Sequence, residues 1–443
     1  MSYVAFISLL PILITSSLVR LNLCDEKSLL LYFGKLRQPE NGECFPNRSA
    51  LLQRLSVEML ELSCQKWRQY NEEINVTKSL TATNSIFTEN QINYLKSLST
   101  DLKANFNKRT NYISVRKEIR SMSYDERSKF FDTVRKLKTE EKVDGVSKYD
   151  LLVYLRHPHL APASQMGASF LPWHREYLRR FEVALQQIDL NVFLPFWNPE
   201  IDSSLPNPAD SLLWSALYVG TGRGSIKTGS FSNWTFATKL DENSQIVYEP
   251  LQRNLRKASR WISSGQSPNG NDARYILSRK KFEDFSVCSG SKIEIISRKV
   301  HDWIGGTMAD LPRSPRDPLY FLYHAYLDYL YETWRRFKSY LERTKNYPKG
   351  SKACAKYHQG DAPMWPFLDT SFRNIDGLSD IYTQIYYTYQ NEPVCGKSDD
   401  QCLSNHLFCD KKDAKCLSKI RLGGNCSSPE SCFLSKCTGG ICS

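Results

Sequence analysis

The sequence predicts a mainly α-helical fold with long loops, followed by a small disulfide-rich module. Apolar residues recur at helical spacing in separated segments such as Phe170 to Glu182 and Tyr320 to Phe337. The stretch between Asn191 and Lys281 is instead rich in Pro, Gly, Ser and Asn, which is typical of loops with short helices. Eight of the thirteen cysteines lie between Cys395 and Cys442. With 443 residues, 41% of them hydrophobic, the chain is long enough to bury one large core.

The first residues resemble a secretion signal. An apolar run from Val4 to Ile14 precedes the small residues Thr15 to Ser17, so we expect a cleaved signal peptide over residues 1–17. A membrane anchor is the alternative, but the run is too short to span a bilayer comfortably, and no later segment is apolar for long enough. The cysteine density agrees with a secreted, extracellular protein. Secretion would make four glycosylation sequons meaningful, at Asn47, Asn75, Asn233 and Asn425.

The net charge of +12 arises from scattered basic residues rather than from one Lys/Arg run. A solvated basic surface is the simplest interpretation, and extracellular matrix or an acidic glycan is a candidate partner. Nucleic acid is not expected, because the chain carries no recognition motif.

Residues 18–110 are polar and weakly periodic, with Cys24, Cys44 and Cys64 about twenty positions apart. We interpret them as a disulfide-containing N-terminal extension. The main helical domain is expected over residues 111–394. Within it no internal repeat is apparent.

The helices of this domain have recognisable boundaries. Ser123 to Glu126 form a capping box that starts the first helix. A second helix covers Lys148 to Leu155 and ends before Pro158. The third lies in the stretch Phe170 to Glu182 and begins near His174, and a fourth covers Ile293 to Trp303. Residues 346–392 are expected to form a loop-rich wrap around these helices.

Residues 395–443 change abruptly to cysteine-dense sequence and are predicted to be a separate module. Zinc is not expected, because C-x2-C pairs are absent and secretion favours disulfides. Eight cysteines allow 105 pairings, so the connectivity stays open. Cys395 could instead close the helical domain, and the odd total of thirteen predicts one free or intermolecular thiol. The module's cysteines are Cys395, Cys402, Cys409, Cys416, Cys426, Cys432, Cys437 and Cys442.

Three histidines stand on apolar helical patterns. Alone, His174 would more often be a packed core residue than a metal ligand. About 130 positions later, however, His301 and His324 lie on two further helical segments. Distant helices that each present an inward histidine can build a metal site in a helical bundle.

Four motifs together resemble the tyrosinase family in its secreted invertebrate form. They are PASQMGASFLPWHREYLRRFE, LPFWN, VHDWIGGTM and DPLYFLYHAYLDYLYETW, and the resemblance runs from about Tyr112 to Cys395. It implies a helical bundle with a type-3 pair of copper ions, each held by three histidines, that oxidises phenols and catechols to quinones with O2. A phenolic small molecule would then be the substrate.

By this resemblance, only three of the family's six ligand positions are histidines in this sequence. His157 stands beside the first position and is a candidate substitute, and His159 is near. Of the seven histidines in the chain, five lie in the helical core, so they cannot fill six positions. The six positions are Arg156, Gln165 and His174 in the first half, and Ser297, His301 and His324 in the second.

These departures predict a tyrosinase-like protein with a degenerate copper site, catalytically weak or inactive, that acts through binding or in a matrix. The alternative is an active copper-dependent phenol oxidase with a site remodelled around His157, His174, His301 and His324. A third hypothesis is a single metal ion at His301 and His324. Asp328, four residues after His324, could orient its imidazole or could pair within the core.

Overall fold

A computed structural model describes most of the chain outside its N-terminal part. The described residues are 87–108, 113–158, 160–240, 246–256, 270–288, 291–354, 356–364, 366–367, 372–396 and 402–443. The predicted signal peptide, Cys24, Cys44, Cys64, Asn47 and Asn75 lie outside them. Among the described residues no helix is both long and apolar enough to cross a membrane.

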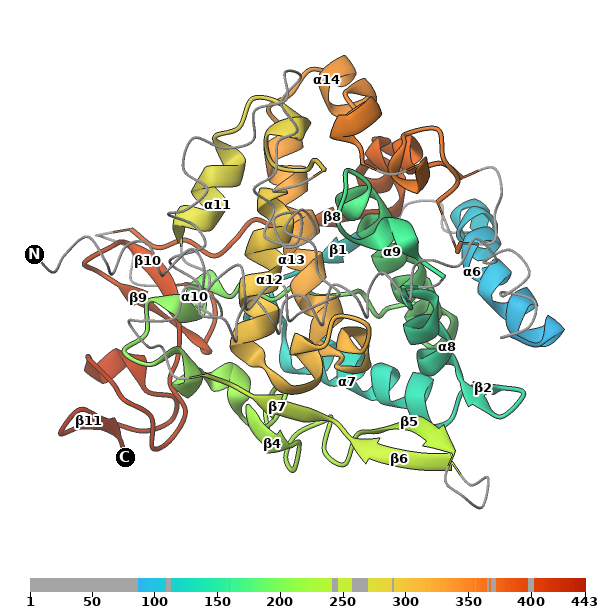
Figure 1. Cartoon of the computed structure of the whole chain (residues 1–443). Helices are drawn as coiled ribbons and strands as arrows, with labels where there is room; N and C mark the ends of the chain where they lie inside the picture. The colour runs from blue at the N-terminus through green and yellow to red at the C-terminus, as the bar shows by residue number, and fades with distance from the viewer. Residues whose placement is uncertain are drawn as a thin grey trace, which may run out of the picture.

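The described part is mainly helical, as expected (Figure 1). Its α-helices are α6 (Glu89–Lys108), α7 (Tyr124–Thr139), α8 (Lys148–Leu155), α9 (Phe170–Ile188), α10 (Glu200–Ser203), α11 (Gly270–Leu277), α12 (Lys292–Ile304), α13 (Leu319–Arg335) and α14 (Tyr340–Lys345). The shorter turns are η1 (Ile119–Ser121), η2 (Pro162–Ser164), η3 (Pro208–Asp210), η4 (Leu212–Trp214), η5 (Phe282–Asp284), η6 (Gly306–Ala309), η7 (Ser314–Arg316), η8 (Gly350–Lys352), η9 (Lys356–His358), η10 (Asn374–Leu378), η11 (Tyr382–Tyr386) and η12 (Pro429–Ser431).

Helix α9 is the centre of the bundle. It contacts α6, α7 and α13, and every residue from Phe170 to Gln186 is buried. Phe181 of α9 stacks on Phe321 of α13 with ring centroids 3.7 Å apart. The stacked pair buries apolar area from two helices far apart in sequence and so fixes them against each other.

Two of the predicted helix boundaries in this region are confirmed. The Ser123 hydroxyl accepts from the Glu126 amide, and the Glu126 carboxylate accepts from the Ser123 amide, which completes the capping box of α7. Helix α8 ends at Leu155, three residues before Pro158. The helix expected to begin near His174 starts four residues earlier, at Phe170, because Pro172 lies in its first turn, where a missing amide hydrogen does no harm.

The described residues also contain short strands, none of which was predicted from the sequence. The strands are β1 (Ser114–Arg116), β2 (Lys142–Val143), β3 (Val146–Ser147), β4 (Arg223–Ser225), β5 (Thr235–Leu240), β6 (Ile246–Pro250), β7 (Gln252–Asn254), β8 (Tyr387–Tyr389), β9 (Leu407–Asp410), β10 (Lys415–Ser418), β11 (Cys437–Thr438) and β12 (Ile441–Cys442). The β5–β6 and β4–β7 pairs lie inside the stretch from Asn191 to Lys281, which we expected to hold only loops and short helices. Strand β8 pairs in parallel with β1, so the wrap closes onto the start of the domain.

The C-terminal segment forms a disulfide-rich unit, as predicted, and all eight of its cysteines pair with one another. Cys395–Cys409 and Cys402–Cys416 interlace around the β9–β10 hairpin. Cys426–Cys437 and Cys432–Cys442 interlace in the same way around β11–β12. The alternative in which Cys395 closes the helical domain is therefore wrong. In each half the first cysteine pairs with the third and the second with the fourth, although the cysteine spacing differs between the halves.

This segment packs on the helical part. The Leu212 amide donates to the Lys419 carbonyl at 2.8 Å, and the hydroxyls of Ser211 and Ser418 lie 2.9 Å apart. Apolar side chains Leu205 and Ile201 of the helical part complete its two small cores.

Candidate metal centre

Three histidines from three helices meet in the core. His174 comes from α9, His301 from α12 and His324 from α13. The His174 and His324 rings stack with centroids 4.4 Å apart, and the His301 and His324 Nε2 atoms lie 3.1 Å apart. Each side chain is at most 2% exposed. The structure therefore brings together the three histidines that the sequence singled out.

Backbone carbonyls orient two of these rings. His174 Nδ1 donates to the Phe170 carbonyl, and His301 Nδ1 donates to the Met308 carbonyl, both at 2.8 Å. Met308 reaches His301 because Gly305 and Gly306 turn the chain back at φ 68° and 56°. A Cβ at Gly306 would lie 2.2 Å from the Gln252 carbonyl oxygen, so this turn needs glycine.

These bonds fix where the protons lie in the neutral cluster. Because His174 and His301 donate from Nδ1, their Nε2 atoms are acceptors. The Tyr320 hydroxyl donates to His174 Nε2 at 2.7 Å, and His324 Nε2 donates to His301 Nε2. The Nδ1 of His324 then carries a lone pair, and it has no hydrogen-bond partner among the described residues.

A buried cation stands beside the cluster. Arg156, directly after α8, is 1% exposed. Its Nη1 donates to the Leu311 carbonyl at 2.6 Å, and its side chain also hydrogen-bonds the Tyr320 hydroxyl. No ion pair between described residues includes Arg156, and its Nε has no hydrogen-bond partner there.

The surroundings keep all three imidazoles neutral. Burial lowers the pKa of His301 to about 3, and it lowers the pKa values of His174 and His324 well below the ordinary value. The Arg156 charge adds to each of these shifts. Burial also raises the pKa of Tyr320 to about 12, so its hydroxyl stays protonated and can donate to His174.

Gln165 and Ser297 are both buried near this region. The Ser297 hydroxyl hydrogen-bonds Tyr323, whose hydroxyl also donates to the Ile296 carbonyl at 3.2 Å. Gln165 follows η2 and precedes Met166 and Gly167.

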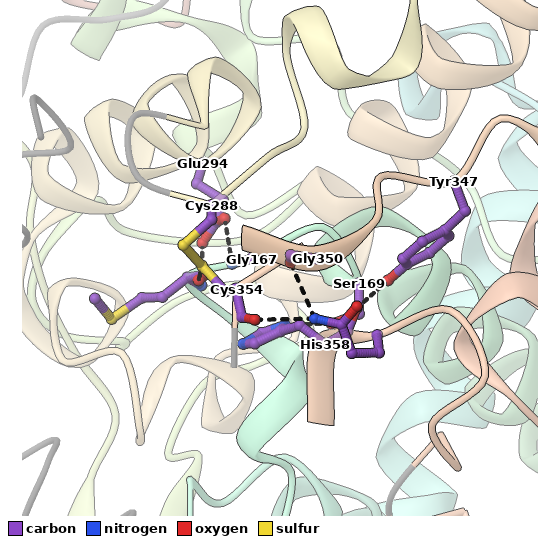
Figure 2. The surroundings of a disulfide bond; sticks show 10 residues. Gly167, Ser169, Cys288, Glu294, Tyr347, Gly350, Cys354 and His358 are labelled. Carbon is purple, nitrogen blue, oxygen red and sulfur yellow. Dashed lines mark hydrogen bonds between the residues drawn. A yellow bond between two sulfur atoms is a disulfide. The ribbon is translucent and has the colours of Figure 1, made fainter. Parts of the chain in front are cut away.

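Glu294 holds the loop that carries Gln165. Its carboxylate accepts from the amides of Met166 at 2.5 Å and Gly167 at 3.1 Å. Glu294 is three positions before Ser297 and seven before His301, so it shares their face of α12. Burial raises its pKa to about 7. Figure 2 shows Glu294 beside the Cys288–Cys354 disulfide, which ties the segment before α12 to the wrap.

The remaining site predictions have mixed outcomes. His157 is half-buried next to Arg156, and His159 lies outside the described residues. Asp328 accepts no hydrogen bond from His324, whose Nδ1 has no partner among the described residues. Instead, Arg175 Nε donates to Asp328 at 2.8 Å, and the hydroxyls of Tyr387 and Tyr389 donate to it at 2.5 and 2.8 Å. These contacts agree with the other expectation for Asp328, pairing within the core.

Two contributors were missed by sequence reasoning, Tyr320 and Glu294. Tyr320 lies four residues before His324 and therefore on the same helical face. Glu294 likewise lies on the same helical face as Ser297 and His301, three and seven residues before them. Helical spacing from the histidines would have identified both residues.

The cluster is not a closed three-nitrogen site as it stands. Imidazole nitrogens bind ions such as Zn²⁺ at about 2.0–2.1 Å. Three imidazole nitrogens on one ion therefore lie within about 4.2 Å of one another. Within the described ranges, only cysteines that form disulfides make groups of three metal-binding atoms within 4.8 Å. His301 and His324 satisfy the spacing as a pair, and His174 does not join them.

Comparisons with known proteins agree with this architecture. The common central domain of tyrosinase matches residues 146–337. A tyrosinase-like protein of Pinctada maxima is 34% identical over 334 residues, which cover 70% of this chain and 70% of that protein. A tyrosinase-like protein of Caenorhabditis elegans is 28% identical over 347 residues, and the match spans 47% of its length. Among solved structures, a polyphenol oxidase of Thermothelomyces thermophila matches with a TM-score of 0.50 at 17% identity, over 72% of this chain and 100% of that one, which shows the fold alone.

Proposed function

Because this chain belongs to the tyrosinase family, we propose that it is a secreted member whose histidine cluster does not hold the family's pair of copper ions. It would serve as a binding protein of the extracellular matrix rather than as an oxidase. A protein can keep the fold of an enzyme family without the catalytic activity, because the activity depends on the site residues and not on the fold. The net charge of +12 supports an acidic extracellular partner such as a glycan.

The observation that carries this proposal is the position of Arg156. A guanidinium is always protonated, and here it is buried beside three histidines and forms no ion pair with a carboxylate of the described residues, although the more distant Glu294 feels its charge. A cation at that place repels metal ions, and burial removes the water that would screen the repulsion. Its pKa effects on all three imidazoles indicate that this field reaches the whole cluster.

Tyr320 supports the same conclusion. Its hydroxyl occupies His174 Nε2, the nitrogen that points into the cluster, and its ring stacks on His324 at 4.0 Å between centroids. Of the other expected ligand positions, Gln165 offers a poor ligand and Ser297 offers none. The residues present therefore do not fit a pair of copper ions, and a phenol has no open path to histidines that are at most 2% exposed.

A single ion between His301 and His324 is the second candidate. Their Nε2 atoms are 3.1 Å apart, which matches two ligands of one ion. Binding would require His324 to move its proton to Nδ1, where no described residue accepts it.

The experiment is to measure copper by elemental mass spectrometry in the secreted, copper-reconstituted protein, with protein quantified in the same sample. We expect near-zero copper, no change of melting temperature on adding copper, and no oxidation of a catechol. Two coppers per chain would contradict the proposal, and one copper that is lost in His301→Ala would favour the second candidate.

A reconstructed variant provides the matched control. It combines the substitutions Arg156→His, Gln165→His, Ser297→His and Tyr320→Phe. Together they remove the guanidinium and the phenol hydroxyl, and they place a histidine at each of the three ligand positions that lack one. We expect this variant to take up copper under the same conditions. Equal and negligible uptake by both proteins, with the variant folded by circular dichroism, would show that Arg156 and Tyr320 are not the cause.

A further inference from the structure

A hollow lies where the disulfide-rich segment meets the start of α7, apart from the histidine cluster. Its volume is about 640 Å³. One side is formed by residues around Tyr124, and the other by two loops of the disulfide-rich segment, at Leu403 and Leu434. Tyr124 is 72% exposed, Leu403 87% and Leu434 90%. Three large apolar side chains therefore surround one concave surface.

The two leucines are held in an unfavourable backbone conformation. Leu403 has φ 53° and Leu434 has φ 51°, in the left-handed region that favours glycine and asparagine. Leu403 lies one residue after Cys402 and Leu434 two residues after Cys432, and each of these cysteines is the second in its half of the segment. Both side chains are almost fully exposed, so packing against the described residues does not compensate for this conformation. Strain of this kind, held by a disulfide frame, is typical of positions that serve binding.

The floor of the hollow is positively charged. Arg127 is buried there, donates to the Met122 carbonyl at 3.3 Å, approaches His406 Nδ1 at 3.5 Å and lies over the Tyr218 ring, but it takes part in no ion pair between described residues. The neighbouring His406 has its pKa lowered to about 4, first by burial and then by Arg127 and Lys419. The one acid of the lining, the half-buried Glu126, is already paired with Lys117 at 2.5 Å.

We propose that this hollow is a docking site for an extended segment of a partner protein that carries aliphatic side chains next to a carboxylate. The aliphatic groups would pack between Leu403, Leu434 and Tyr124, and the carboxylate would face the Arg127 side of the floor. A concave surface suits an inserted peptide better than a flat lipid surface. The proposal is independent of whether the histidine cluster binds copper.

The test is a titration of the full-length secreted protein with a fluorescein-labelled heptapeptide in which leucine and glutamate alternate, followed by fluorescence polarisation. A second peptide replaces each glutamate with lysine, and a third replaces each leucine with serine. We expect saturable binding of the first peptide alone, and binding about tenfold weaker or worse for the other two.

Variants of the protein separate binding from folding. Leu403→Asn and Leu434→Asn place a residue that tolerates positive φ at each strained position, so the melting temperature should stay equal or rise. Each should nevertheless weaken peptide binding about tenfold or more. Leu422→Asn is the matched control, because Leu422 is an exposed leucine of the same segment, 68% exposed, that does not line the hollow. It should leave binding unchanged.

Three outcomes would overturn the proposal. They are absence of binding by the acidic peptide, equal binding by the lysine peptide, and equal weakening by Leu422→Asn. Vesicles of phosphatidylcholine with and without phosphatidylserine form a further arm. Sedimentation with the anionic vesicles, in the absence of peptide binding, would assign the exposed leucines to a membrane surface instead.

Discussion

The buried His358 makes the stability of this protein depend on pH in a way that one substitution isolates. Its ring is 2% exposed, and its Nδ1 donates to the Ser169 hydroxyl at 2.6 Å, which in turn donates to the Ala163 carbonyl. Burial lowers the pKa of His358 to about 3. In the unfolded chain the pKa would be about 6.5.

The sign follows from that difference. A lowered pKa means that the unfolded state binds more protons between pH 6.5 and 3, so acid favours unfolding. The neutral ring contributes its full stability above about pH 6.5 and loses about 2 kcal/mol of it by pH 5. His358→Asn removes the titration but keeps an amide N–H near the Nδ1 position to donate to Ser169.

Urea denaturation of both proteins between pH 8 and pH 5, with disulfides intact, measures this effect. The free energy of unfolding should fall by about 2 kcal/mol more in the wild type than in His358→Asn. Comparing the two proteins cancels groups with opposite effects, such as Glu294, whose raised pKa favours the folded state on acidification. Parallel pH profiles would refute the reasoning, and would mean that the ring is hydrated or charged in the folded protein.

Two further predictions concern the framework. Asp328→Asn should destabilise the fold by about 3 kcal/mol, because it removes the carboxylate that the buried guanidiniums of Arg175 and Arg116 share and leaves each with one other carboxylate, Glu332 and Glu182 respectively. Thermal or urea unfolding will measure this loss, and a value below about 1 kcal/mol would contradict the pairing. Replacing both Cys288 and Cys354 with alanine should cost about 4 kcal/mol, since their disulfide closes a loop of 66 residues. A shift in urea midpoint checks this loss, and its absence would indicate that the loop ends stay together without the bond.

Much of the framework could be predicted from the sequence because its signals are local. The capping box at Ser123 and the proline after α8 act within one helical turn, and both boundaries are where they were expected. The β5–β6 hairpin was missed because its strands are stabilised by pairing across a gap, and the surrounding Gly and Ser residues suggested loops alone.

The sequence indicated which histidines meet in the candidate site, but not how their hydrogen bonds are arranged. Periodicity placed His174, His301 and His324 on inner faces, and the fold brings them together. Which nitrogen each ring presents depends on the Phe170 and Met308 carbonyls, and no spacing rule reveals that. Asp328 illustrates the limit: the i, i+4 relation to His324 is real, but Arg175 and two tyrosines compete more effectively for the carboxylate.

The hydrogen-bond chain around the histidines also has a consequence for single substitutions. Replacing Arg156 with histidine alone would leave the Tyr320 hydroxyl on His174 Nε2, and replacing Tyr320 with phenylalanine alone would leave the guanidinium in place. Neither change by itself opens a set of nitrogens to a metal, and each removes a buried hydrogen bond. Under the proposed function, no single substitution at Arg156 or Tyr320 would therefore restore copper binding, and only the two changes together would free the histidine nitrogens.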